Sequence, residues 1–431
     1  MACSSRARLL VAALACFPLW CVAQTQPSNA SNTPDSQAPP VSFFERPRLF
    51  DGPRSPTVVL RNHGVNLDIS YTEYGQAVVA GDGNHGWPFT GKFFPRLTLD
   101  GERLAGWKGF SVNAVGEISV GDSQNTNSGT GLLFPVNTAL FGPADGKYGG
   151  DLSLTVSQRF GERFTVTIGK FNMFEAASRA PIVGGGGIDG FWNLSLAAPF
   201  TGIVPPYIGG GSLSYRTRPA QFTVMIYSPK SAQQQTGFKN WGQNGITVRS
   251  AVLFPANPRG RAGFHTLTFI ASSKTGTDYN DLPQLLLPEH PSLGTRRGSY
   301  YGAYNVQQFL WQDPARPGVG WGVFGLIGFG DANPNPLSWT TNAGVSGTGV
   351  VPRRPLDRFG FGYFYVVPSR QLVNALRAFQ LNYGRETGGE VYYTVAVAGW
   401  FRMTADLQVV VPGNHKMNTV VLPGISAQIR F

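Results

Sequence analysis

Short segments in which apolar and polar residues alternate strictly recur along this chain of 431 residues. The pattern is clear at 152–157, 164–169, 221–226, 266–269 and 358–365. Because side chains on a β-strand point alternately to opposite faces, a period of two predicts strands with one apolar and one polar face. Between the first two segments, Gly161 and Glu162 predict the turn of a hairpin. An all-β chain of many short strands is therefore expected.

The last third of the chain shows this alternation most clearly. Apolar residues occupy one face of segments 390–397, 404–411 and 424–431, and Ala398-Gly399 and Pro412-Gly413-Asn414 predict the turns between them. The opposite face carries small, amide or charged residues. The final segment ends on the aromatic residue Phe431. We expect this last strand to close the sheet, so that no edge is left free.

Glycine and proline exclude an architecture of long helices, since the chain contains 55 glycines and 32 prolines and both break helix interiors. After residue 23 no apolar run approaches the roughly 18 residues that a membrane helix needs. A soluble sandwich and a transmembrane barrel both remain compatible with the alternation, because barrel strands expose apolar residues to lipid only at every second position.

Two features favour the transmembrane antiparallel barrel. The polar face consists of Gly, Ser, Thr, Gln and isolated charges, as expected of a water-filled lumen. Aromatic residues also gather near strand ends, where an interfacial girdle would lie: Phe160, Phe171, Tyr215, Tyr227 and Trp400. Strands of about 9–11 residues with their connections predict a barrel of about 16 to 18 strands, with short periplasmic turns and longer outer loops.

The N-terminus has the pattern of an export signal. Arg6 and Arg8 precede an apolar stretch, and Cys21-Val22-Ala23 supplies small residues for cleavage. We expect a signal peptide over 1–23, a flexible polar leader over 24–45 and an outer-membrane barrel over 46–431. All three cysteines lie before residue 23, so the exported protein is expected to have no disulfide.

Strand parity and one long connection supply the candidate substrate and pore-lining residues. Parity places seven side chains toward the lumen: Arg358, Glu390, Arg402, Asp406, Gln408, Gln428 and Arg430. A long glycine-rich segment carries Glu175, Arg179, Asp189 and Trp192. It either folds inward as a constriction or lies outside as a plain extracellular loop. Opposing charges at a constriction filter ions, and hydrogen-bonding groups select polar solutes.

Asp331 and Asn333 are a further pair with two interpretations, since they either bind substrate or fix a turn in an Asp-x-Asn-Pro segment. The five histidines have no spacing typical of zinc ligands, so no metal and no cofactor are expected. Basic residues are scattered and form no stripe, which argues against nucleic acid. No motif of an enzyme is present in a convincing context.

Several segments resemble the OprB family of carbohydrate-selective porins. They are Leu97–Asp100, Gly106–Phe110, Thr167–Phe171, Gly328–Pro336, Glu390–Tyr393, Thr404–Gln408 and the terminal Phe431. Ala332 stands where the family usually has glycine, and the run from Gly184 to Gly187 is unusually glycine-rich. The resemblance implies a 16-stranded outer-membrane barrel and passive diffusion of glucose-type sugars and oligosaccharides.

Two alternatives to a sugar porin remain at this point. A net charge of +11 suits a general or anion-preferring porin, since basic side chains in a lumen attract anions. A non-channel β-protein that binds glycans is the other alternative.

The partners expected for a porin are sugars, outer-membrane lipid with lipopolysaccharide, and the barrel-assembly machinery. Monomers and homotrimers both fit.

Overall fold

The computed structural model describes residues 42–52, 55–127, 129–141, 148–184, 186–239, 241–289 and 292–431. The expected signal peptide, 1–23, and the expected leader up to residue 41 lie outside these residues.

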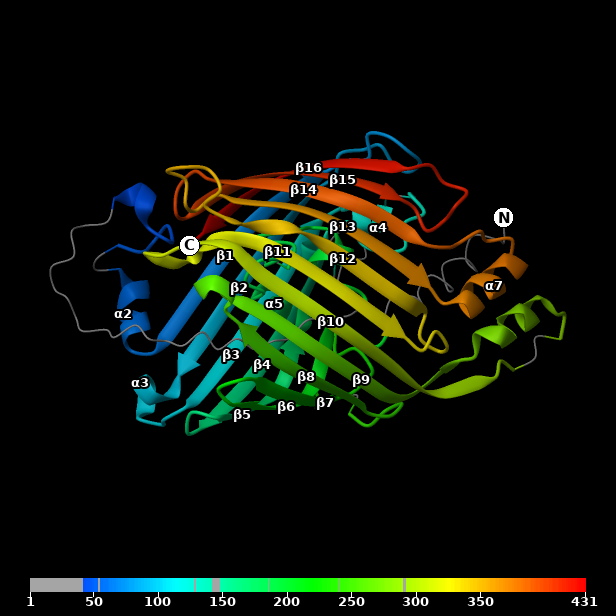
Figure 1. Cartoon of the computed structure of the whole chain (residues 1–431), viewed down its shortest axis with the longest axis horizontal. Coiled ribbons are helices and arrows are strands. Elements are labelled where there is room, and N and C mark those ends of the chain that lie inside the picture. The colour runs from blue at the N-terminus through cyan, green and yellow to red at the C-terminus, as the bar shows by residue number, and fades with distance from the viewer. Residues whose placement is uncertain are drawn as a thin grey trace.

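The described residues form sixteen strands that make one closed antiparallel barrel (Figure 1). The strands are β1 Val65–Gln76, β2 Phe89–Asp100, β3 Phe110–Gly121, β4 Tyr148–Phe160, β5 Phe164–Asn172, β6 Tyr207–Arg216, β7 Gln221–Tyr227, β8 Thr247–Ala256, β9 Gly263–Thr277, β10 Thr295–Asp313, β11 Arg316–Gly330, β12 Leu337–Thr348, β13 Arg358–Pro368, β14 Glu386–Ala396, β15 Phe401–Val411 and β16 Val420–Arg430. The predicted fold class and the lower of the two predicted strand numbers are confirmed.

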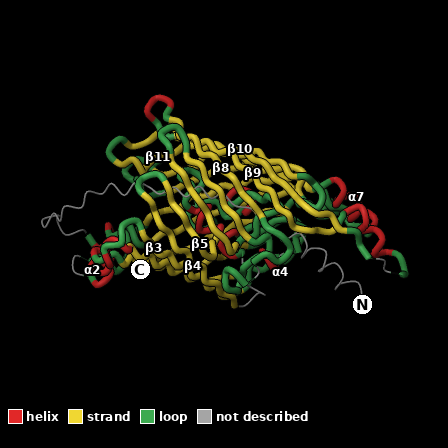
Figure 2. Tube along the Cα trace, turned by 90° about the horizontal axis from the view of Figure 1, so that it is seen from below, coloured by secondary structure: helices red, strands yellow, loops and turns green. Residues whose placement is uncertain are grey.

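Each strand pairs with its neighbours in sequence, and β1 pairs with β16 to close the ring. This closing seam runs from Ser70 opposite Arg430 to Gln76 opposite Gly424. Figure 2 shows the strands tilted across the long axis of the molecule. Closure leaves the sheet without an exposed edge. A lipid environment requires this, because it offers no hydrogen-bond partners to unpaired backbone groups.

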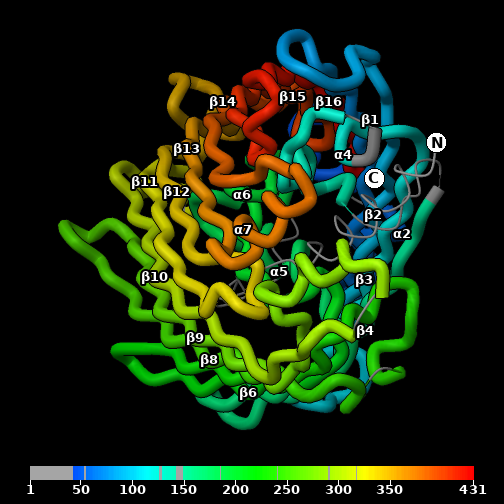
Figure 3. The backbone as a smooth tube through the Cα atoms, turned by 90° about the vertical axis from the view of Figure 1, so that its right-hand side faces the viewer, coloured from blue at the N-terminus to red at the C-terminus, as the bar shows by residue number. Residues whose placement is uncertain are grey.

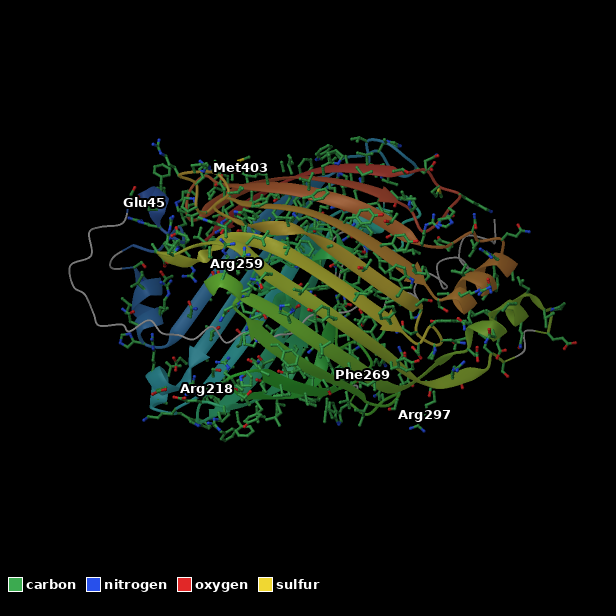
Figure 4. The ribbon with its side chains drawn as sticks, in the orientation of Figure 1. Glu45, Arg218, Arg259, Phe269, Arg297 and Met403 are labelled. Carbon is green, nitrogen blue, oxygen red and sulfur yellow. The ribbon has the colours of Figure 1, made fainter. Side chains whose placement is uncertain are left out.

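Apolar side chains cover the outside of the barrel. On β7, Phe222, Val224 and Ile226 are exposed, whereas Gln221, Thr223 and Met225 between them are buried. Figure 4 shows the same outward face at Phe269 and Met403, which are 55% and 50% exposed. This pattern is the reverse of a soluble sandwich, in which the apolar face is the covered one.

Tyr227, an aromatic residue predicted for the girdle, points into the barrel. Tyr227 is only 1% exposed and packs inside the barrel with Met225 and Ile270. It ends β7 on the same side as Met225, so parity directs it inward. The prediction was wrong because it used only the position of Tyr227 at a strand end and ignored its face.

The two ends of the barrel differ in the length of their connections. At the short-turn end, the connections include 161–163, 217–220, 314–315 and 397–400. At the long-loop end they include 122–147, 228–246, 278–294 and 369–385, and α7 lies there (Figure 1). The short helices are η1 Phe43–Glu45, α2 Pro56–Asn62, α3 Gly101–Ala105, α4 Gln124–Asn127, η2 Thr138–Leu140, α5 Met173–Ser178, α6 Leu194–Ala197, η3 Pro258–Gly260, η4 Tyr279–Leu286 and α7 Arg370–Ala378.

The interior of the barrel contains α5 and α6, which lie within the ring of strands when the molecule is seen from the α7 end (Figure 3). Both belong to the connection between β5 and β6, whose described residues, 173–184 and 186–206, we call the inward segment. Among the described residues, no helix has the length and apolar character needed to cross a membrane.

Candidate functional site

The inward segment fills one side of the lumen. Its residues Phe191, Leu194 and Leu196 are at most 1% exposed and belong to a large apolar cluster inside the barrel. Phe191 meets Phe324 of β11 and Tyr392 of β14 edge to face, with ring centroids 5.3 and 5.0 Å apart. The glycine-rich connection therefore lies inside the barrel and not over its rim.

Buried polar side chains of the wall hold the inward segment. The Glu390 carboxylate accepts hydrogen bonds from the backbone amides of Trp192, at 2.5 Å, and Asn193, at 2.9 Å. The Asn193 side chain donates to Gln408 at 3.1 Å, and the Gln408 amide in turn donates to the Asp406 carboxylate at 3.0 Å. Glu390, Asp406 and Gln408 do point inward, but the segment covers them and they do not reach open space.

Trp192 is also covered. Its indole is fully buried and packs edge to face on Tyr74, with centroids 5.3 Å apart. A β-carbon placed on Gly424 would lie 2.4 Å from the indole, so glycine at this position of β16 makes room for it. Trp192 is therefore a packing residue of the inward segment and offers no exposed ring to a solute.

Asp189 forms a charged contact between the inward segment and the wall. Its carboxylate lies 2.5 Å from Arg430 and 3.4 Å from Arg402. Burial raises the pKa of Asp189, but the positive charges of Arg430, Arg402 and Arg358 outweigh this effect and lower the pKa to about 2. Arg358 itself donates to the carbonyl of Ile182 at 2.7 Å, so it too binds the inward segment.

A cavity of about 290 Å³ remains between the inward segment and the wall formed by β1, β2, β3 and β16. Charged side chains of both signs line it: Asp68, Lys92, Arg96, Glu117, Glu175, Arg179, Asp189 and Arg430. Ser70, Gln428 and Phe94 add neutral polar and aromatic surface. Of the residues predicted from sequence, Glu175, Arg179, Asp189, Gln428 and Arg430 thus border open space.

Ion pairs cross this cavity from the segment to the wall. Glu175 lies in α5, where Asn172 caps the helix by accepting from the amides of Phe174 and Glu175. Its carboxylate is 2.7 Å from Arg179 and 3.1 Å from Arg96 of β2. Most of the Glu175 side chain is covered, so a short helix presents a fixed carboxylate to two guanidinium groups.

Phe94 is an aromatic surface that the sequence interpretation missed. The Lys92 ammonium and the Arg96 guanidinium lie 5.6 and 5.7 Å from its ring centroid, within the range of cation–π attraction. Lys92 also pairs with Glu117 at 3.2 Å. The signal was present, because even-numbered residues of 89–100 and odd-numbered residues of 110–121 form polar faces. Pro95 on the outer face of β2 makes that alternation harder to recognise.

Asp331 and Asn333 lie apart from the cavity. Asp331 accepts from the Ser299 hydroxyl at 2.9 Å, and Asn333 donates to Asp278 at 2.8 Å. The amide of Tyr279 donates back to Asn333 at 3.3 Å. These contacts join the β11–β12 connection to β10 and to the start of η4 at the long-loop end, and they fit the turn interpretation better than substrate binding.

The terminal Phe431 lies at the short-turn end, where its amide donates to the carbonyl of Ile69 at 2.9 Å and its ring stacks on Phe50.

Among the described residues, no cluster of three or more histidine, cysteine or carboxylate side chains is arranged to hold a metal ion. The arrangement of the site is that of a polar cavity lined by paired charges.

The sequence model of the carbohydrate-selective porins, OprB family, matches residues 89–431. That range covers well over half of the chain.

The chain belongs to the OprB family of carbohydrate-selective porins.

Solved structures agree with this assignment at the level of fold. Pseudomonas putida OprB at high pH matches with a TM-score of 0.75 and 17% identity, covering 87% of this chain and 96% of that one. The outer membrane channel DcaP of Acinetobacter baumannii gives a TM-score of 0.52 and 9% identity, covering 85% of this chain and 97% of that one. No curated protein matches the sequence.

Family and fold together identify this protein as a sugar-selective porin of the outer membrane. They imply a channel rather than an enzyme. The predicted function is confirmed at that level. The non-channel glycan-binding alternative does not fit an apolar outer face and a closed ring of strands.

Proposed function

We propose that sugars cross this porin by passive diffusion through the cavity between the inward segment and the β1–β3 and β16 wall. The observation that carries the proposal is the lining itself, in which fixed carboxylates and guanidinium groups lie beside the ring of Phe94. Sugars present hydroxyl groups, which charged side chains can bind, and C–H faces, which pack on aromatic rings. No bond of the solute is made or broken in this mechanism.

Paired charges suit passage better than single charges. Glu175 is already satisfied by Arg96 and Arg179, so a sugar hydroxyl replaces part of an existing interaction and gains little net free energy. A conducting pore needs such weak binding, since a solute has to leave as readily as it enters. In this proposal the sugar contacts Phe94, Arg96, Glu175, Arg179, Asp189 and Arg430. Glu390, Asp406, Gln408 and Trp192 position the inward segment, and Arg358 and Arg402 anchor it.

Single-channel conductance in planar bilayers, titrated with glucose and maltose, tests the proposal. We expect sugar to reduce the wild-type conductance saturably. Phe94→Ala and Arg96→Ala should weaken that block by about tenfold or less, which is the loss of one contact worth about 1 kcal/mol. Arg297→Ala is the matched control, because Arg297 is an exposed residue of β10 outside the cavity (Figure 4).

The outcomes of this titration separate the candidate functions. Sugar block that is unchanged in Phe94→Ala and Arg96→Ala would place the pathway elsewhere in the barrel. Conductance that is indifferent to sugar but selective for anions would favour the general, anion-preferring porin that the net charge of +11 suggests.

We further propose that the chain is exported with cleavage after Ala23 and that the barrel-assembly machinery recognises the terminal Phe431. Lipopolysaccharide would surround the long-loop end, because outer-membrane barrels carry their longer loops outside. N-terminal sequencing of the purified porin tests the cleavage site. Chemical cross-linking in the membrane distinguishes the homotrimer from the monomer.

A further inference from the structure

An N-terminal segment outside the matched family region docks at the short-turn end of the barrel. This segment consists of residues 42–52 and 55–62, while the family match begins at residue 89. The amide of Leu49 donates to the carbonyl of Arg430 at 2.8 Å, and the amide of Gly399 donates to Phe44 at 2.8 Å. Figure 4 marks the segment at Glu45.

Aromatic contacts fix the segment next to the closing seam. Phe50 stacks on Phe431 with ring centroids 6.0 Å apart, and Phe43 packs on Trp400 at 5.3 Å. The Trp400 indole also donates to the carbonyl of Phe43 at 3.1 Å. Both β16 and the β14–β15 turn therefore hold the segment, and its position relative to the mouth of the barrel is defined.

From this segment Arg48 extends to the wall of the proposed sugar pathway. Its guanidinium lies 3.0 Å from the carboxylate of Asp68, a residue of β1 that lines the cavity. The Arg48 side chain is only 17% exposed, whereas that of Asp68 is 37% exposed. Arg96 lies at 4.0 Å from Asp68, so Arg48 is the closer of these two basic partners.

Arg48 also joins a continuous series of ion pairs that connects the inward segment with the N-terminal segment. In order, the series is Arg179–Glu175, Glu175–Arg96, Arg96–Asp68, Asp68–Arg48, Arg48–Asp51 and Asp51–Arg61. Charges of opposite sign alternate along it. Its part between Arg179 and Asp68 borders the cavity, and Arg48 is the next charge beyond.

We propose that Arg48 is a specificity-determining residue that sets the charge at the short-turn mouth of the sugar pathway. The inference rests on the pathway proposed above. With Arg48 in place, the exposed Asp68 carboxylate is neutralised and the mouth favours neutral solutes. Without Arg48, Asp68 faces the passage with its nearest positive charge removed. Because charges focus their field inside a narrow low-dielectric passage, cations would then be enriched at that mouth.

Reversal potentials measured in a KCl gradient across a bilayer test the proposal. We expect Arg48→Gln to shift the reversal potential toward potassium selectivity, and more strongly at low salt, where screening is weaker. Arg61→Gln removes the same charge from the same segment but faces Asp51, so it should leave the reversal potential near the wild-type value. Arg48→Lys should restore most of the wild-type selectivity.

A double substitution separates the local charge from a folding effect. Asp68→Asn in the Arg48→Gln background removes the carboxylate that has lost its closest basic partner and should return the reversal potential to the wild-type value. If Arg48→Gln only loosened the segment, the double variant would stay shifted, and the proposal would be overturned. Equal reversal potentials for Arg48→Gln and Arg61→Gln would also overturn it. Failure of the proposed function is a separate result, namely absence of sugar block in the wild type.

Discussion

Asp189 lies between basic side chains that come from three strands of the wall, Arg358 on β13, Arg402 on β15 and Arg430 on β16. Burial raises its pKa and these charges lower it, with a net value of about 2. A carboxyl group whose pKa is depressed on folding stabilises the fold at any pH above its unfolded value. That contribution is lost as the pH falls through the folded pKa.

The charge of Asp189 should therefore be constant over the range in which porins are normally assayed. We expect the difference in maltose block between the wild type and Asp189→Asn to stay constant from about pH 8 down to about pH 4, and to vanish only as the pH approaches 2. Single-channel titrations of both proteins at several pH values measure it. A difference that disappeared with a midpoint near pH 5 or 6 would contradict the ion-pair arrangement around Asp189.

At the scale of elements, the inward segment depends on one buried carboxylate of β14. Glu390 is 1% exposed and accepts from two backbone amides of the segment. Loss of this acceptor leaves both amides buried without a partner, at a cost of about 1–3 kcal/mol each. Glu390→Ala should therefore release the segment from the wall, raise the single-channel conductance and weaken sugar block.

Glu386 on the same strand provides a matched control. It is also 1% exposed and also accepts from two backbone amides, those of Leu133 and Gly413, but neither belongs to the inward segment. Glu386→Ala should lower the temperature of unfolding, measured as the temperature at which heating changes the mobility of the folded barrel on gels. Sugar block should stay near the wild-type level. Identical conductance and block in the two variants would mean that Glu390 does not position the segment.

The strands could be predicted from sequence because alternation is a local property. Segments 390–397, 404–411 and 424–431 became β14, β15 and β16 with their faces as expected. Parity identifies the side of the sheet on which a residue lies, but not what covers that side. Glu390 and Gln408 thus point inward as predicted, yet they lie behind a segment that is about 200 residues away in sequence.

The cavity wall was harder to predict for a related reason. Lys92, Phe94 and Arg96 have the correct parity on β2, but which part of the wall stays open depends on where the inward segment packs. That packing follows from shape, since Gly360 and Gly362 of β13 leave room for Phe191 and Leu196, and Gly424 leaves room for Trp192. Sequence periodicity does not contain this information.

At the scale of the whole molecule, the barrel is apolar on the outside and carries both an apolar cluster and paired charges inside. The interior cluster forms because the inward segment brings its own apolar residues into the lumen. The apolar residues of the outer face are exposed, and in a membrane acyl chains cover them. Stability of the assembled porin should thus depend differently on charges introduced on its two faces.

Leu407 on β15 allows this difference to be measured. It is 41% exposed, lies between Val391 of β14 and Pro423 of β16, and is near the middle of its strand. An arginine on the lipid-facing side near the bilayer midplane costs about 2–4 kcal/mol. We expect Leu407→Arg to lower the free energy of unfolding from lipid vesicles by that amount, as measured in guanidinium.

Ser70→Arg on β1 is the matched substitution on the inner face, because Ser70 lines the cavity, where water solvates a new charge. It should change the unfolding free energy by less than about 1 kcal/mol, since surface charges cost little, while reducing the conductance by narrowing the passage. The two variants thus separate stability from permeation. Equal losses of stability would show that the outer face at Leu407 does not contact lipid, and unchanged conductance in Ser70→Arg would show that solutes do not pass beside β1.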